Sequence, residues 1–242
     1  MRRALFLVTA IGLCAISHPA LAQEITLSLG DNASLAGRSV QMIALLTVLS
    51  LVPGLAIMLT CFPFIVTVLA ILRQAIGLQQ SPPNMLIISL ALFLTYFVME
   101  PTFSQAWTDA VEPLTNNAIT VPEAIDAGLA PFRSFMAART APDTFLSLQS
   151  LRPDAPADLS ADAPLSVLVP SFLLSEISRA FEIGFLIYLP FLIIDLVVAA
   201  VLMSMGMMMV PPAVVSMPFK LAFFVVADGW TLLSEALVRG YF

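Results

Sequence analysis

The sequence predicts an all-α membrane protein built from two kinked helical hairpins, about four apolar helices in all, plus a periplasmic helical region. Hydrophobic residues make up 60% of the 242 residues, charged residues only 11%, and the mean hydropathy is +0.98. A soluble domain is about 45–50% apolar and about 25% charged. The chain has too little polar material to cover a core in water, so lipid or other subunits must cover it.

Residues 1–22 are typical of a cleavable signal peptide. A positive start and an apolar stretch over 4–16 precede the small residues 20–22, so cleavage is expected between Ala22 and Gln23. An uncleaved first membrane helix is the alternative, but the apolar stretch is shorter than the ~20 residues that a span needs. The sequence therefore indicates export into or across a bacterial-type inner membrane.

Residues 40–100 form the first predicted hairpin. Its first apolar block, 40–72, is interrupted by Pro53 and Pro63, and proline removes a backbone N–H that a helix interior needs. The second block, 85–99, has about 15 residues, which is short for a membrane span. Kinked helices rather than simple spans are expected here.

The long polar region 101–182 separates the two hairpins and is rich in acidic residues. Within it, residues 152–164 are rich in Ala, Pro and Asp, which predicts a flexible loop. A signal peptide directs the segment that follows it across the membrane, so the short polar segment 23–39 is expected outside. With the first hairpin between them, the acidic region is then expected in the periplasm. The loop that contains Arg73 then faces the cytoplasm, as the positive-inside rule prefers.

The second predicted hairpin, 183–242, contains the turn MSMGMMMVPP at 203–212. Gly206 and the pair Pro211-Pro212 must interrupt the helix here and free backbone N–H and C=O groups. Yet the turn contains no charged or amide residue, although a hairpin turn in water is usually polar. Non-helical backbone at membrane depth survives only where protein buries it or where it lines a cavity. The turn is therefore expected inside an assembly.

Met207, Met208 and Met209 in this turn allow two interpretations. They could fill gaps in an apolar core, which methionine does well because it is unbranched and has three rotatable bonds. Alternatively, several copies around an axis could form a deformable apolar constriction that excludes water and ions. Such a gasket would still part for a passing chain.

Three charged residues lie in the second hairpin: Asp195, Lys220 and Asp228. A charge at mid-bilayer costs about 2.5–3.5 kcal/mol on insertion scales, so each one needs a partner or water. Lys220 is the only lysine of the chain, and we expect an ion pair between Asp195 and Lys220, with Asp228 as a second buried acid. Proton relay by the aspartates is an alternative, and so is an intramembrane aspartyl protease, whose usual Gly-x-Gly before the second aspartate is missing.

Composition also excludes several kinds of chemistry. Cleavage at residue 22 would remove the single histidine, His18, together with Cys14, and leave one thiol at Cys61. No zinc site, no cofactor and no His-based catalytic residue is therefore expected. The net charge of −6 gives no basic patch for nucleic acid, and no Walker motif is present.

Several strings together resemble the FliP family of flagellar type III export-gate proteins. They are LSLVPGLAIMLT, LRQAIGLQQSPPN, LALFLTYFVMEP, SEISRAFEIGF, LPFLIIDLVVAAVLMSMGMMMVPP and SMPFKLAFFVVADGW. The resemblance extends from about Leu49 to Trp230, and the last three strings are specific in combination.

The resemblance implies a gate of several copies, arranged as a pentamer-like ring. Together with FliQ and FliR, this ring would form the channel through which flagellar proteins are secreted. It implies a place in the inner membrane at the flagellar basal body, inside the MS ring, with FlhB and FlhA docked to it. The methionine gasket of the family would correspond to Met207, Met208 and Met209, and its acid–lysine pair to Asp195 and Lys220.

The chain departs from the family pattern at two places. At Pro63 and Phe64 the family commonly has Thr-Arg, and at Ala141 and Pro142 it commonly has Arg-Glu. Any contact that the family makes through those arginines is absent here.

Two other functions remain open at this stage. One is the injectisome homologue of the same gate. The other is a small secondary transporter that uses Asp195 and Asp228 for coupling ions. A transporter would stay intact as a monomer or dimer in detergent, whereas a gate subunit would purify as a large ring.

Overall fold

The computed structural model describes residues 40–242 with gaps at 41, 45, 48–49, 52–53, 55–56, 78–81, 153–157 and 208. The predicted signal peptide 1–22, its cleavage site at Ala22 and Gln23, and the polar segment 23–39 lie outside the described residues. Met208 lies outside them as well.

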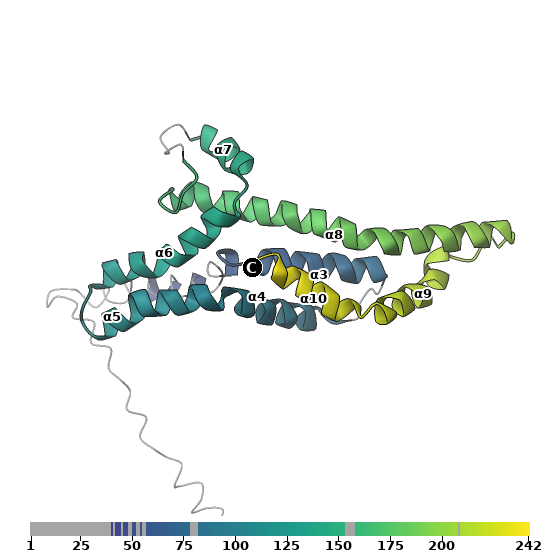
Figure 1. Ribbon diagram of the computed structural model, residues 1–242, viewed down its shortest axis with the longest axis horizontal. Coiled ribbons are helices and arrows are strands. Elements are labelled where there is room, and N and C mark those ends of the chain that lie inside the picture. Colours follow the sequence, from purple (N-terminus) through teal and green to yellow (C-terminus); the bar gives the residue numbers. More distant parts are fainter. Residues whose placement is uncertain are drawn as a thin grey trace, which may run out of the picture. The chain divides into compact units, whose positions relative to one another are not determined.

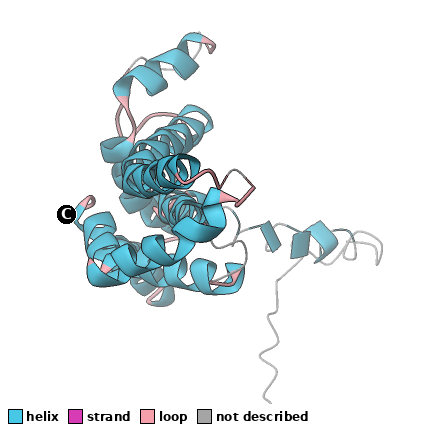
Figure 2. Cartoon of the chain, turned by 90° about the vertical axis from the view of Figure 1, so that its right-hand side faces the viewer, coloured by secondary structure: helices cyan, strands magenta, loops and turns pink. Residues whose placement is uncertain are grey.

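The chain divides into two compact units, Met1–Val48 and Leu49–Phe242. The described part of the second unit is built from helices and connecting loops (Figures 1 and 2). In chain order they are α3 (Phe62–Ile76), α4 (Asn84–Ala106), the π-helix η1 (Trp107–Val111), α5 (Glu112–Thr115), α6 (Val121–Arg139), α7 (Pro142–Ser150), α8 (Leu165–Ser204), α9 (Pro212–Val226) and α10 (Gly229–Arg239). The predicted all-α class is confirmed.

Two continuous helical stretches are long and apolar enough to cross a membrane, judged by length and composition. They are Asn84–Thr115, which comprises α4, η1 and α5, and Leu165–Ser204, which is α8. The bent pair α9 and α10 passes the same test only if both helices count as one span. The described chain therefore contains two or three candidate spans.

The start of α3 explains the first departure from the family pattern. Pro63 lies in the first turn of the helix, where its missing N–H has no intrahelical partner to lose. Ile65, Val68 and Leu72 are buried and follow one another by three and four residues, so they form one face of the helix. Pro63 therefore marks a helix start and not a kink within a helix.

The apolar block at 85–99 is part of a longer helix, which corrects the expectation that it is too short to span. α4 continues past Pro101 to Ala106 and then through η1 and α5 to Thr115. The apolar composition ends at Glu100, but the helix does not, because its later part packs along α6 (Figure 1).

α6 begins with a pair of residues that satisfies free helix N–H groups. The Glu123 carboxylate accepts a hydrogen bond from the Thr120 N–H at 2.7 Å and from the Thr120 hydroxyl at 2.9 Å. These bonds favour the ionised carboxylate and hold the pKa of Glu123 below its usual value. A threonine followed three residues later by a glutamate is typical of such a helix start.

α8 has 40 residues and crosses the boundary that the sequence predicts between 182 and 183. The polar region and the second hairpin thus share one helix. The described end of the predicted flexible loop, 158–164, is held against α6, because Arg133 Nη1 donates to the carbonyls of Ala161 at 3.3 Å and Ala163 at 3.2 Å.

The part of the second predicted hairpin that follows the methionine turn forms two helices, α9 and α10, with a bend of 62° between them. Asp228 at the bend has a left-handed backbone, with φ of 48°. A Cβ at Gly229 would come within 2.2 Å of the Phe224 ring, so only glycine fits here without a shift of that ring. The sequence did not lead us to expect this bend.

Two clusters of buried side chains hold the unit together, and α8 contributes to both. The first surrounds α3 and includes Phe64, Leu72 and Phe191. The second joins α6, α7 and α8 and includes Phe145 and Phe172. α8 is therefore the element that connects the apolar hairpins to the polar region.

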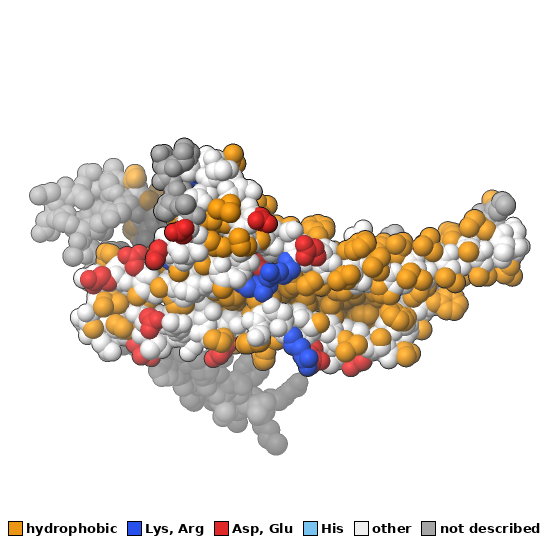
Figure 3. All heavy atoms as spheres, turned by 45° about the horizontal axis from the view of Figure 1, so that its top comes forward, with side chains coloured by type: hydrophobic (Ala, Val, Ile, Leu, Met, Phe, Trp, Pro, Cys, Tyr) orange, Lys and Arg blue, Asp and Glu red, His pale blue; other side chains and the backbone are white. Residues whose placement is uncertain are grey.

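The surface divides into an apolar part and a charged part (Figure 3). Hydrophobic side chains cover the end toward the tip of α8, while acidic side chains gather toward the opposite end. Phe93 and Phe97 on α4 and Phe185 and Leu196 on α8 are among the exposed apolar residues. Apolar surface of this extent marks contact with lipid or with other proteins.

Candidate functional site

The connection between α8 and α9, residues 205–211, forms a charge-free tip. The Met207 N–H donates to the carbonyl of Leu202 at 3.0 Å, and the Gly206 N–H to that of Met203 at 3.1 Å. Gly206 has a φ of 75°, which glycine adopts readily and other residues do not. This pair of bonds is a Schellman motif, which satisfies carbonyls at the helix end without water or a polar side chain.

The two prolines then start the next helix. Pro211 is the residue before the first turn of α9 and Pro212 is its first residue, where a missing N–H does no harm. Gly206 thus ends one helix and the prolines begin another, and the tip between them carries no ionisable group.

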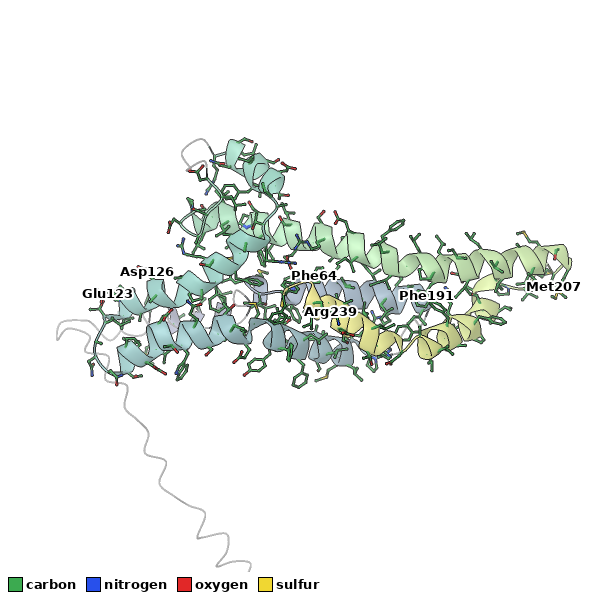
Figure 4. The ribbon with its side chains drawn as sticks, in the orientation of Figure 1. Phe64, Glu123, Asp126, Phe191, Met207 and Arg239 are labelled. Atoms are coloured by element: carbon green, nitrogen blue, oxygen red, sulfur yellow. The ribbon has the colours of Figure 1, made fainter. Side chains whose placement is uncertain are left out.

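Met207 and Met209, the described members of the methionine triplet, are not enclosed in the core of this chain. Met209 is 97% exposed and Met207 38% exposed, and Figure 4 shows Met207 at the far end of the α8–α9 hairpin. Met207 lines an apolar cleft of about 580 Å³ with residues of both helices, among them Leu202, Val215 and Phe219. Their thioethers are therefore free to contact lipid or another protein chain.

The structure brings Asp195 and Lys220 together. Lys220 Nζ lies 2.6 Å from Asp195 Oδ2, and the Ser216 hydroxyl donates to Asp195 Oδ1 at 2.5 Å. Ser216 and Lys220 lie four residues apart on α9, so both face the same side. The aspartate of α8 thus has a partner for each oxygen.

Lys220 has a second acceptor, the Ala75 carbonyl of α3, at 3.0 Å. The last four carbonyls of a helix lack intrahelical partners, and a cation there is favoured by the helix dipole. One buried ammonium group therefore fastens three helices, α3, α8 and α9, below the tip.

Asp228 is not a buried acid in this chain, which corrects the prediction. Its side chain is exposed at the bend and accepts a hydrogen bond from the Thr231 hydroxyl at 3.1 Å. The aspartate lies directly before α10, where the chain changes direction, a place that its position in an apolar block did not reveal.

Sequence reasoning missed a second polar cluster around Glu176 of α8, whose side chain is fully buried. Arg139 Nε of α6 lies 3.2 Å from one carboxylate oxygen, and the Tyr241 hydroxyl donates to the other. The signal was the string SEISRAFEIGF, whose first glutamate, Glu176, comes directly after an apolar helical stretch. Its partners could not be read from the sequence.

The second departure from the family pattern also lies near this cluster. The Ala141 N–H donates to the Ser175 hydroxyl of α8 at 2.9 Å, and Pro142 is the first residue of α7. Phe64, from the first departure, packs edge-on against Tyr241 with ring centroids 5.6 Å apart. These residues therefore have defined roles within this chain.

In the part of the chain that the structure describes, no group of three or more His, Cys, Asp or Glu side chains could hold a metal ion. Cys61 is buried there as a free thiol. The described polar side chains around Asp195 and Glu176 are thus engaged in ion pairs and hydrogen bonds between helices.

Comparison with known proteins gives one consistent result. The sequence profile of the FliP family matches residues 45–237. A flagellar biosynthetic protein FliP of Caulobacter vibrioides is 49% identical over 242 residues, which is 99% of this chain and 91% of the relative. The FliP proteins of Agrobacterium fabrum (46% identical, 98% of each chain) and Bacillus subtilis (47% identical, 84% of this chain and 92% of the relative) are similar as well.

Proposed function

The chain belongs to the FliP family of flagellar biosynthetic proteins, and we propose that it is a core subunit of the flagellar type III protein export gate. In this proposal it assembles as a pentamer-like ring and forms, with FliQ and FliR, the channel through which flagellar proteins are secreted. The gate lies in the bacterial inner membrane at the basal body, inside the MS ring, where FlhB and FlhA dock to it.

The observation that carries the proposal is the exposed, charge-free tip. Met209 is 97% exposed, and two backbone hydrogen bonds around Gly206 close the end of α8 without a polar side chain. A tip in water would gain nothing from this apolar surface, whereas a ring of tips around an axis would bury it. Methionine side chains suit such a ring because they repack around varied shapes.

The contacts below the tip support the same role. Lys220 joins α8, α9 and α3, so the base of the α8–α9 hairpin has a fixed geometry while its end remains free. A seal that must hold ions at rest and part for an exported chain needs such a rigid base and a deformable end.

The proposed role requires no catalytic residue in this chain, and energy for export comes from other components. A secondary transporter would need Asp195 and Asp228 to bind coupling ions. Asp195 is paired with Lys220 and Ser216, and Asp228 accepts a hydrogen bond from the Thr231 hydroxyl of α10. The relatives reported above are flagellar proteins, so we propose the flagellar gate and not its injectisome homologue.

Purification from the membrane tests the proposal. We expect the full chain, extracted in mild detergent, to elute as a large ring together with two smaller membrane proteins. A particle image would show several copies around one axis. A chain that remains a monomer or dimer, with no other membrane protein bound, would contradict the proposal.

A further inference from the structure

The segment that follows α10 reaches back to helices made much earlier in the chain. The Tyr241 hydroxyl donates to Glu176 of α8, and Arg139 Nη1 of α6 donates to the Gly240 carbonyl at 2.8 Å. Arg139 and Gly240 are 101 residues apart in sequence. Two successive residues thus contact both α6 and α8.

The ring of Tyr241 lies among three more groups. Its centroid is 5.6 Å from that of Phe64 on α3 and 6.1 Å from that of Phe135 on α6, and the Arg139 guanidinium lies 4.1 Å from the same centroid. Figure 4 labels Phe64 on α3 and Arg239 at the end of α10. The neighbouring Phe242, by contrast, is 78% exposed.

Glu176 makes these contacts interdependent. Its side chain is fully buried, and Arg139 is the nearer of its two cationic partners, at 3.2 Å against 3.9 Å for the half-exposed Arg179. A buried carboxylate that loses a hydrogen-bond donor bears a large desolvation cost. Release of Tyr241 would therefore raise the free-energy cost of burying Glu176, and would destabilise the packing of α6 on α8 that keeps this carboxylate buried.

We propose that Gly240 and Tyr241 form a clasp that fixes α6 and α7 against α8 only after α10 has packed in place. Because α10 is made after α6, α7 and α8, these additional contacts of the polar region form only in a chain synthesised through Tyr241. The clasp is a built-in check that the second hairpin is complete before the polar region can meet other subunits. The contacts of the clasp do not depend on the gate proposal, but its role as a check rests on that proposal.

Hydrogen–deuterium exchange on the full chain, in the assembly in which it is extracted, tests the clasp. Tyr241→Phe removes one hydroxyl and keeps the ring. We expect amide exchange in α6 and α7 to rise about tenfold or more, as for the loss of a hydrogen bond to a charged group, with exchange in α9 unchanged. Arg139→Lys keeps the charge but loses the planar group, and is expected to give the same pattern.

Phe242→Ala and Arg239→Ala are matched controls, because Phe242 is exposed and Arg239, among the described residues, forms an ion pair with the exposed Glu235 of its own helix. Both should leave α6 and α7 as they are. A double variant of Glu176→Gln and Tyr241→Phe should exchange no faster in α6 than Glu176→Gln alone. Unchanged exchange in α6 and α7 with Tyr241→Phe, or an equal rise in α9, would overturn the proposal.

Discussion

Lys220 shows how a single charge can be kept in an apolar hairpin. Its ammonium group is almost completely covered and donates to the Asp195 carboxylate and to the Ala75 carbonyl. Both acceptors come from other helices, so the contacts that stabilise the buried charge also fix the positions of these helices relative to α9. We attribute to it the alignment of α8 and α9 below the tip.

Lys220→Ala should destabilise the chain by about 1–3 kcal/mol, because it leaves Asp195 without its cation. The loss stays below the ~3–5 kcal/mol typical of fully buried pairs, since the Asp195 side chain is 31% exposed. Thermal unfolding in detergent measures it, and Asp195→Ala in the same chain should restore part of the loss.

The exposed pair of Arg239 and Glu235, with nitrogen and oxygen 2.5 Å apart, is the matched control for that measurement. Arg239→Ala should change stability by less than about 1 kcal/mol. If the Lys220 and Asp195 double variant is no more stable than either single variant, the two side chains do not stabilise each other.

Residue-scale prediction worked where the sequence offers few choices. Lys220 is the only lysine and its helix follows that of Asp195, so the pair could be proposed from the sequence. The Ala75 carbonyl and the partners of Glu176 could not, because they depend on how α3, α6 and α10 pack. Asp228 was mistaken for a buried acid because its apolar neighbours conceal a bend.

At the scale of helices, the tip depends on how α8 ends. Gly206 in the left-handed conformation allows two backbone hydrogen bonds that close the helix without polar side chains. A tip closed in this way can remain entirely apolar, which a seal against ions requires.

Gly206→Ala should therefore destabilise the tip by about 1–2 kcal/mol, because alanine is strained at positive φ. Nothing lies near enough to clash with the added methyl group, so strain and not crowding would be the cause. Gly240→Ala is the control, with a φ of −63°, and should change little. Thermal unfolding of both variants measures these changes in stability. Equal losses of stability in the two variants would show that the conformation of Gly206 is unimportant.

Helix existence was predictable, and helix limits were not. The apolar blocks marked the first part of α4 and the second half of α8, because hydropathy reports which residues can contact lipid. It does not report where a helix ends, and both helices extend into polar residues that pack on α6. The bend at Asp228 and Gly229 escaped for the same reason, since both arms around it are apolar.

For the whole molecule, the division of the surface matters most. The apolar part includes the tip and long faces of α4 and α8, and the acidic part gathers away from it (Figure 3). The family of the chain could be recognised from its sequence, and the comparisons confirm it. The ring, its partner proteins and the seal remain proposals that follow from this surface and from the tip.

Ion leakage through the membrane tests the seal most directly. Met207, Met208 and Met209 are replaced together by alanine, and Met85→Ala, an exposed methionine of α4, serves as the control. In cells that assemble the complex, we expect the triple variant to pass small ions and the control to remain tight. A triple variant that assembles normally and stays as ion-tight as the unaltered protein would contradict the role of these methionines as a seal.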